Sequence, residues 1–194
     1  MDIQENKIEG LLEIIPTVYR DERGYFLETF HTDRFRALGL DHDFVQVNQS
    51  FSKRGVLRGL HFQRAPHQQG KLISVIRGIV LDVAVDLRPG SPTYGQHVKM
   101  IVDSERHNLV YVPEGFAHGF VALEDTIFSY QCTNHYHQAA DSGIRWDDPD
   151  LAIDWELAHY GIEHPIISEK DQRLPSFAQH NQQSVPTVED SADV

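Results

Sequence analysis

The sequence is poor in cysteine and has no long apolar run. Its one cysteine, Cys132, excludes an intrachain disulfide, so nothing in the cysteine content points to secretion. No stretch approaches the roughly 20 apolar residues that a membrane span requires. Residues 1–10 lack the basic start and the apolar segment of a signal peptide. We therefore expect a cytoplasmic protein that has no membrane partner.

Positive charge is scarce as well. There are 17 Lys and Arg against 29 Asp and Glu, which gives a formal net charge of −12. This balance argues against nucleic acid as a partner, but a small anionic substrate needs only a local group of cations. The length of 194 residues suits one domain. We expect that domain to span residues 1–180, followed by a disordered acidic tail over 181–194.

Helical signals are few, and most of the chain has the pattern of short strands. In Ile79–Leu87 apolar residues alternate with Asp82 and Asp86, which is the period of a strand. Turns rich in glycine, proline and aspartate separate similar apolar runs. Short helices are expected only at Thr32–Leu40 and Leu151–His159. The pattern predicts a mostly β fold, either a sandwich or a barrel, with a few short helices.

Residues able to carry chemistry are densest in Gly55–Lys71. Arg58 and His61 lie in one predicted strand, and strict alternation would point them to opposite faces. Gly59 lies between them. A bulge at this glycine would bring both side chains into one cavity.

A second segment, Val110–Phe120, has a Pro-x-Gly turn before His118 and resembles the second half of a cupin motif. The first half of that motif is a His-x-His pair followed by an acid, which together bind a metal. Here the pair is replaced by His61–Gln63, and Lys71 lies about where the acid is expected. Because a lysine would repel a cation, we predict a cupin-like barrel with no metal and no other cofactor.

Six segments, in order along the chain, resemble the dTDP-4-dehydrorhamnose 3,5-epimerase family. The resemblance covers roughly Ile8 to Ala178 and implies a cupin or jelly-roll β-barrel, usually a homodimer, that binds a dTDP-4-keto-6-deoxy-sugar. The segments are Asp21–Phe30 (DERGYFLETF), Phe44–Gln63 (FVQVNQSFSKRGVLRGLHFQ), Gly70–Gly95 (GKLISVIRGIVLDVAVDLRPGSPTYG), Val112–Leu123 (VPEGFAHGFVAL), Tyr130–Tyr136 (YQCTNHY) and Ser168–Pro175 (SEKDQRLP).

The resemblance implies four catalytic residues. His61 matches the general base and Asp171 the acid that orients it. Tyr130 matches the general acid on the opposite face of the sugar, and Lys71 matches the group that stabilises the enolate oxygen. From the residues alone, Tyr130 could instead be a packed core tyrosine, and Asp171 a surface acid or turn former.

The resemblance also implies a set of substrate-binding residues: Arg23, Phe26, Glu28, Gln46, Asn48, Arg58, His118 and Tyr136. The first three are expected to hold the thymidine end from the neighbouring subunit. Arg58 is expected to contact the diphosphate, which suits a forked guanidinium. His118 remains open between a place in the cavity and a hydrogen bond to backbone at the barrel mouth.

The function implied is epimerisation of C3 and C5 of dTDP-4-keto-6-deoxyglucose through an enolate, as in dTDP-L-rhamnose biosynthesis. Inversion of a carbon requires that the proton return on the face opposite to its departure, so two proton carriers are needed. Three alternatives stay open. They are an epimerase of one carbon or a ketoisomerase on the same scaffold, a non-catalytic cupin that binds a small molecule, and a metal-dependent cupin oxygenase.

Overall fold

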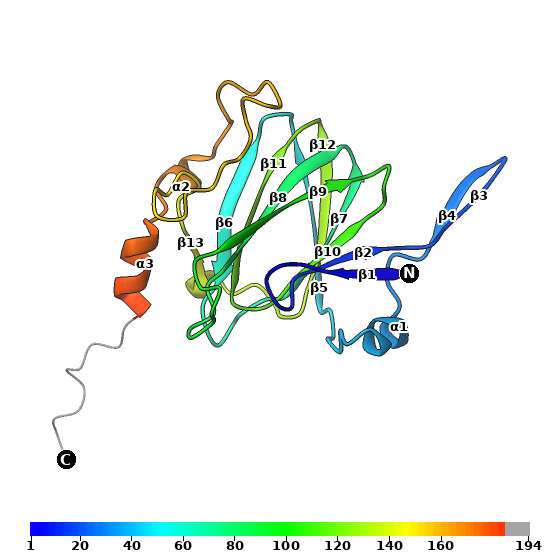
Figure 1. Cartoon of the computed structure of the whole chain (residues 1–194), viewed down its shortest axis with the longest axis horizontal. Coiled ribbons are helices and arrows are strands. Elements are labelled where there is room, and N and C mark those ends of the chain that lie inside the picture. Colours follow the sequence, from blue (N-terminus) through cyan, green and yellow to red (C-terminus); the bar gives the residue numbers. More distant parts are fainter. Residues whose placement is uncertain (185–194) are drawn as a thin grey trace, which may run out of the picture.

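The computed structural model describes residues 1–184, and these form two antiparallel sheets that face each other (Figure 1). The six-stranded sheet has the order β1 (Asp2–Glu5), β2 (Leu12–Ile15), β10 (Leu109–Val112), β7 (Lys71–Arg77), β12 (Thr126–Cys132) and β5 (Gln46–Ser52). The five-stranded sheet has the order β13 (Asp141–Gly143), β6 (Leu57–Gln63), β11 (Phe116–Ala122), β8 (Ile79–Asp86) and β9 (His97–Asp103).

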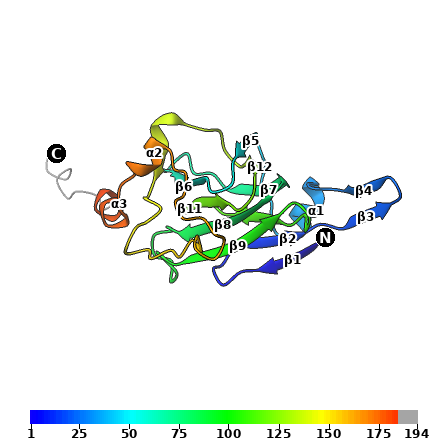
Figure 2. The same ribbon diagram turned by 90° about the horizontal axis from the view of Figure 1, so that it is seen from above.

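Little else in the described chain is regular. The hairpin of β3 (Val18–Asp21) and β4 (Gly24–Leu27) projects away from both sheets (Figures 1 and 2). The helical elements are short: α1 (Thr32–Ala37), the 3₁₀ turn η1 (Gln138–Ala140), α2 (Glu169–Gln172) and α3 (Phe177–Ser184). None of the helices in residues 1–184 is long and apolar enough to cross a membrane.

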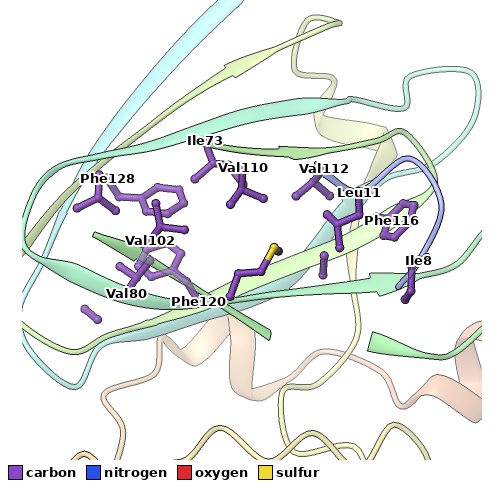
Figure 3. Packing of buried hydrophobic residues seen from close by; sticks show 14 residues of the cluster. Ile8, Leu11, Ile73, Val80, Val102, Val110, Val112, Phe116, Phe120 and Phe128 are labelled. Carbon is purple, nitrogen blue, oxygen red and sulfur yellow. The ribbon is translucent and has the colours of Figure 1, made fainter. Parts of the chain in front are cut away.

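The main core lies between the two sheets (Figure 3). Ile73 and Val110 project into it from the six-stranded sheet, and Val80 meets them from the five-stranded sheet. Phe120 and Phe128 stack across the gap with ring centroids 4.2 Å apart. Full burial of an aliphatic or aromatic side chain of this size contributes about 1.5–3 kcal/mol, so this layer holds the sheets together.

A second apolar layer covers the outer face of the five-stranded sheet. The chain after β13 runs back over this face and buries Leu151, Trp155 and Ile162 against it. Strand β8 is therefore buried on both faces. The alternation of apolar residues and acids in β8 does not mark a buried face and a solvent-exposed face, because Asp82 and Asp86 are both fully buried.

One local prediction was wrong. Residues 151–159 form turns rather than a helix, since Ala152 and Glu156 adopt φ values of +45° and +54° that a right-handed helix does not allow. The domain boundary predicted at residue 180 falls inside α3, which continues to Ser184. Tyr94 donates a 2.6 Å hydrogen bond to the Asn181 side chain there. The rest of the predicted tail, 185–194, lies outside the described residues.

Candidate active site

Asp171 is brought to the barrel by the segment that precedes α2. Ile166 pairs with Val56, the residue before β6, and backbone hydrogen bonds join it to Gly55 and Leu57. Ser168 caps α2 by accepting a 3.1 Å hydrogen bond from the Asp171 backbone N–H. This is the usual way in which a serine satisfies a free N–H at a helix start. The cap fixes Asp171, which is only 3% exposed, against β6.

Both oxygens of the Asp171 carboxylate are engaged on β6. Oδ1 lies 2.8 Å from His61 Nε2, and Oδ2 accepts a 3.2 Å hydrogen bond from the Gly59 backbone N–H. An ionised carboxylate can only accept, so the hydrogen of a neutral His61 ring is on Nε2. Its Nδ1 is then free to take up a proton, as a general base requires.

The bulge predicted at Gly59 is present. The pairing of β6 with β11 shifts register between His118 and Phe120, and Gly59 has a φ of +120°. A Cβ on Gly59 would lie 2.6 Å from the Gly119 Cα and 2.8 Å from the His118 carbonyl oxygen. Glycine is therefore required here on two counts, backbone conformation and space. As a result Arg58 and His61 line the same cavity.

Tyr130 and Lys71 face His61 from the other sheet. The cavity between them has a volume of about 200 Å³, and the ring of Phe128 also lines it. The Lys71 ammonium lies 5.7 Å from the centre of the Tyr130 ring. Since β6 belongs to one sheet and β7 and β12 to the other, a molecule in this cavity has the imidazole on one side and the phenol on the opposite side.

Burial shifts the pKa values of the groups in this wall. It raises the pKa of Tyr130, so the residue remains a phenol that can give up a proton at neutral pH. It lowers the pKa of Lys71, although the nearby Cys132 and Asp82 oppose that change. For Asp171, burial alone would raise the pKa. The hydrogen bonds from His61, Gly59 and Ser168 outweigh it and keep the pKa below its ordinary value.

Arg58 and Asn48 complete the cavity next to these groups. Arg58 donates to the Ser52 hydroxyl at 3.0 Å and to the Phe51 carbonyl at 3.2 Å. These neutral partners leave its positive charge available to an anion. With Lys71 it gives the cavity a cationic lining within an acidic protein.

His118 occupies the first of its two expected places, the cavity, but with a side-chain partner that was not expected. It lines the cavity and is paired directly with His61 across β11 and β6, but it does not bond to backbone. Instead its Nε2 lies 2.7 Å from Oδ2 of the fully buried Asp82. Burial lowers the pKa of His118, and Asp82 opposes this.

Asp82 was not singled out from the sequence, although a signal existed. Its two neighbours on the same face of β8, Val80 and Ala84, are apolar and belong to the core between the sheets. An acid between two core residues is a sign that the side chain points inward to a partner. Its second oxygen, Oδ1, is buried and has no hydrogen-bonding partner among the described residues.

The remaining predicted site residues lie outside the cavity. Gln46 and Tyr136 lie beside its wall, where the Tyr136 backbone N–H donates to Gln46 Oε1 at 2.9 Å. Arg23 and Phe26 lie on the projecting hairpin, where Phe26 is 69% exposed. Glu28 follows that hairpin and pairs with Arg34 at 2.9 Å. None of these three residues is in the lining of the cavity that holds His61, and the hairpin of β3 and β4 projects away from both sheets (Figure 1).

No cluster of three or more His, Cys, Asp or Glu side chains suited to a metal ion occurs within residues 1–184. The two cavity histidines each direct Nε2 at a carboxylate, and Lys71 adjoins them. A barrel whose pocket holds a carboxylate-bound imidazole opposite a phenol, with cations beside them, defines a class of isomerase that removes and returns protons on an anionic substrate.

Comparison with known proteins identifies that class further. Residues 5–179 match the family model described as dTDP-4-dehydrorhamnose 3,5-epimerase, and the chain belongs to this family. A protein of that name from Methanothermobacter thermautotrophicus is 53% identical over 87% of this chain and 90% of its own length. The predicted family and the cupin-like, mostly β jelly-roll fold are thereby confirmed.

Solved structures support the same family and fold. The dTDP-4-dehydrorhamnose 3,5-epimerase from Elizabethkingia anophelis is 44% identical, superposes with a TM-score of 0.87, and the match covers 93% of this chain and 98% of that one. A 3′-monoepimerase from Streptomyces bikiniensis, solved in complex with dTDP-quinovose, is 35% identical with a TM-score of 0.83 over 92% and 89% of the two chains. One scaffold thus carries enzymes that differ in the carbons they invert.

Proposed function

We propose that this protein epimerises C3 and C5 of dTDP-4-keto-6-deoxyglucose, with His61 as base, Tyr130 as acid and Lys71 as the oxyanion donor. The observation that carries the proposal is the placement of His61 and Tyr130 on opposite sheets around one cavity. Inversion of a carbon needs a proton acceptor on one face and a proton donor on the other, and this cavity supplies both.

Each inversion takes two proton transfers. Neutral His61 removes the proton from the carbon next to the C4 ketone through Nδ1, and the bonding electrons move onto the C4 oxygen. The Asp171 carboxylate stabilises the resulting imidazolium. Tyr130 then gives its hydroxyl proton to the opposite face of the carbon as the C4 carbonyl re-forms. Exchange with water restores the phenol and the neutral imidazole before the second carbon reacts.

Lys71 supplies the electrostatic part of the reaction. An α-proton is far less acidic than imidazolium, so the enolate must be stabilised as it forms. One preorganised donor in a site shielded from water contributes about 3–4 kcal/mol to such a transition state. Lys71 is the cation in the cavity wall next to Tyr130, and Arg58 is left to hold the diphosphate.

A homodimer completes this proposal. Tyr19 and Phe26 are 63% and 69% exposed on the hairpin. On the outer face of the six-stranded sheet, Val47, Phe51 and Ile76 are between 55% and 67% exposed. Exposed apolar side chains of this size on two surfaces are typical of contacts between subunits. The hairpin of one subunit would then bring Arg23, Phe26 and Glu28 to the thymidine end in the neighbouring cavity, and Tyr136 would lie at its rim.

Incubation with dTDP-4-keto-6-deoxyglucose in heavy water tests the reaction. We expect one deuterium at C3 and one at C5, with inversion at both carbons, read by mass spectrometry and NMR. Uptake at one carbon would instead support a single-carbon epimerase, as in the 3′-monoepimerase relative. Binding of the nucleotide sugar without any exchange would overturn the enzymatic proposal.

A further inference from the structure

Tyr130 lies beside a chain of amide groups that the proton-transfer scheme does not use. Asn48 is its direct cross-strand neighbour in the pairing of β5 with β12. Gln46 is two residues earlier on β5, on the same face, and is paired with Cys132. Successive contacts join these groups to the backbone of Tyr136.

The backbone N–H of Tyr136, at one end of this series of amides, fixes the direction of each hydrogen bond in it. A backbone N–H can only donate, so the 2.9 Å contact from Tyr136 N assigns the acceptor role to Gln46 Oε1. Gln46 Nε2 is then the donor in its 3.0 Å contact with Asn48 Oδ1. Asn48 must therefore direct its NH₂ group inward, where one hydrogen meets the Cys132 sulfur at 3.7 Å.

The second hydrogen of the Asn48 amide remains for Tyr130. Asn48 and Tyr130 are paired directly across β5 and β12 and line the same cavity, so this hydrogen lies on the side of the phenol. Burial raises the pKa of Tyr130, and its interaction with Asn48 opposes that change. A phenol oxygen that accepts from Asn48 cannot direct its own hydrogen at the same amide. The hydroxyl hydrogen is left to point into the cavity, which both residues line.

We propose that Gln46 and Asn48 form a positioning relay that aims the Tyr130 hydroxyl at the substrate carbon and stabilises the phenolate after the proton has left. Gln46 acts only through Asn48, and Asn48 acts through Tyr130. A hydrogen bond to a charged oxygen is stronger than one to a neutral oxygen. The relay therefore favours proton delivery more than substrate binding. The inference rests on the proposed role of Tyr130.

Gln46→Glu reverses the relay with almost no change in shape. One oxygen of the new carboxylate still accepts from the Tyr136 N–H, but the other can no longer donate to Asn48. The Asn48 amide then turns its NH₂ toward this carboxylate and presents its carbonyl oxygen to Tyr130. The phenol would donate to that oxygen instead of into the cavity. Gln46→Leu removes the donor without adding charge, so it separates the relay from electrostatic repulsion of the diphosphate.

The readout is the fate of the enolate in heavy water. When delivery from Tyr130 fails, protonated His61 exchanges with solvent and returns a deuteron to the original face. The product is then a deuterated sugar that has not been inverted. We expect Gln46→Glu to lower the ratio of inverted to uninverted deuterated sugar by about tenfold or more, with a smaller drop for Gln46→Leu. Gln4→Glu, the same change on the exposed strand β1, should leave the ratio unchanged.

Two further measurements close the test. In a Tyr130→Phe background, Gln46→Glu should cause no additional change in the ratio, because a residue that acts through Tyr130 has nothing left to act on. Without substrate, the ¹³Cζ NMR signal of Tyr130, assigned by its loss in Tyr130→Phe, should shift in Gln46→Glu. An unchanged ratio, an additional drop in the double variant or an unshifted signal would overturn the relay. Failure of the wild-type protein to exchange at either carbon would instead count against the proposed function.

Discussion

At the scale of single residues, the site depends on how each oxygen of Asp171 is used. Asp171→Asn keeps the size of the side chain but offers an amide NH₂ as well as an oxygen. If that NH₂ faces His61, the hydrogen of the ring moves to Nδ1 and the base is blocked. Replacement of a carboxylate that orients a catalytic histidine by its amide lowers the catalytic rate by about 10⁴-fold.

We therefore expect Asp171→Asn to slow C–H exchange by about 10³–10⁴-fold with little change in the affinity for dTDP-sugar. Single-turnover deuterium exchange and a binding titration measure the two effects. Exchange within about tenfold of the wild-type rate would show that the carboxylate does not set the tautomer.

What the sequence predicts about single residues is uneven. His61 and Arg58 stand out from the bulge signal at Gly59, and the bulge is confirmed. Asp171 was identified by family resemblance alone, because its partner is 110 positions away and no local pattern connects them. Asp82 was missed because period-two alternation does not tell whether the face that carries the two acids is exposed or buried.

At the scale of elements, the β6 bulge can be tested with two glycines of similar conformation. Gly59 and Gly24 have φ values of +120° and +131°, but a Cβ on Gly24 would meet nothing within 4 Å. We expect Gly24→Ala to cost only the backbone strain, about 1–3 kcal/mol of unfolding free energy. Gly59→Ala adds the clash with β11 and should exceed about 4 kcal/mol. Urea titrations compare the two, and equal losses would contradict the close approach of the strands.

The connection between β8 and β9 is held by a buried acid. Asp86 accepts from Arg88 Nε and Nη2 at 2.9 and 2.8 Å, from Ser91 Oγ at 2.6 Å and from Thr93 Oγ1 at 2.7 Å. Burial alone would raise the pKa of Asp86. The hydrogen bonds from Arg88, Ser91 and Thr93 outweigh it and hold the pKa far below its ordinary value.

A depressed pKa makes the stability contributed by Asp86 depend on pH. The contribution is complete above the unfolded-state pKa of about 3.9 and is lost as pH falls through the lower folded value. We expect Asp86→Asn to lower the free energy of unfolding by about 2–4 kcal/mol at pH 7, and the difference from wild type to shrink below about pH 4. Asp147→Asn, which breaks the exposed pair with Arg145, should cost less than about 1 kcal/mol. A pH-independent difference for Asp86→Asn would contradict the assignment.

At the scale of the whole molecule, strand alternation predicted the β class, but it could not predict the layers. The segment over residues 144–177 lacks a clear period in the sequence, and it is this segment that buries the outer face of one sheet. Its turns depend on positive φ at Ala152 and Glu156, residue types that give no turn signal. The short helix predicted there failed for the same reason.

Assembly is the other property that belongs to the whole chain. If the outer face of the six-stranded sheet is the subunit contact, Phe51→Asp places an unpaired charge in it. The free energy needed to bury that charge would prevent dimerisation. We expect a dimer for the wild-type protein and a monomer for Phe51→Asp in sedimentation equilibrium. Leu38→Asp, on the exposed end of α1, should remain dimeric. An active wild-type monomer would show that the hairpin of a neighbouring subunit is not needed in the cavity.

Asp171 is translated after all the strands of the two sheets. It is held by the one-turn helix α2 and by the pairing of Ile166 with Val56 beside β6. A nascent polypeptide can assemble a pocket with its phenol and its cations while the imidazole still lacks its counterion. Partly finished molecules would therefore hold the nucleotide sugar without labelling it, and competence in proton abstraction would arrive as the last event of maturation.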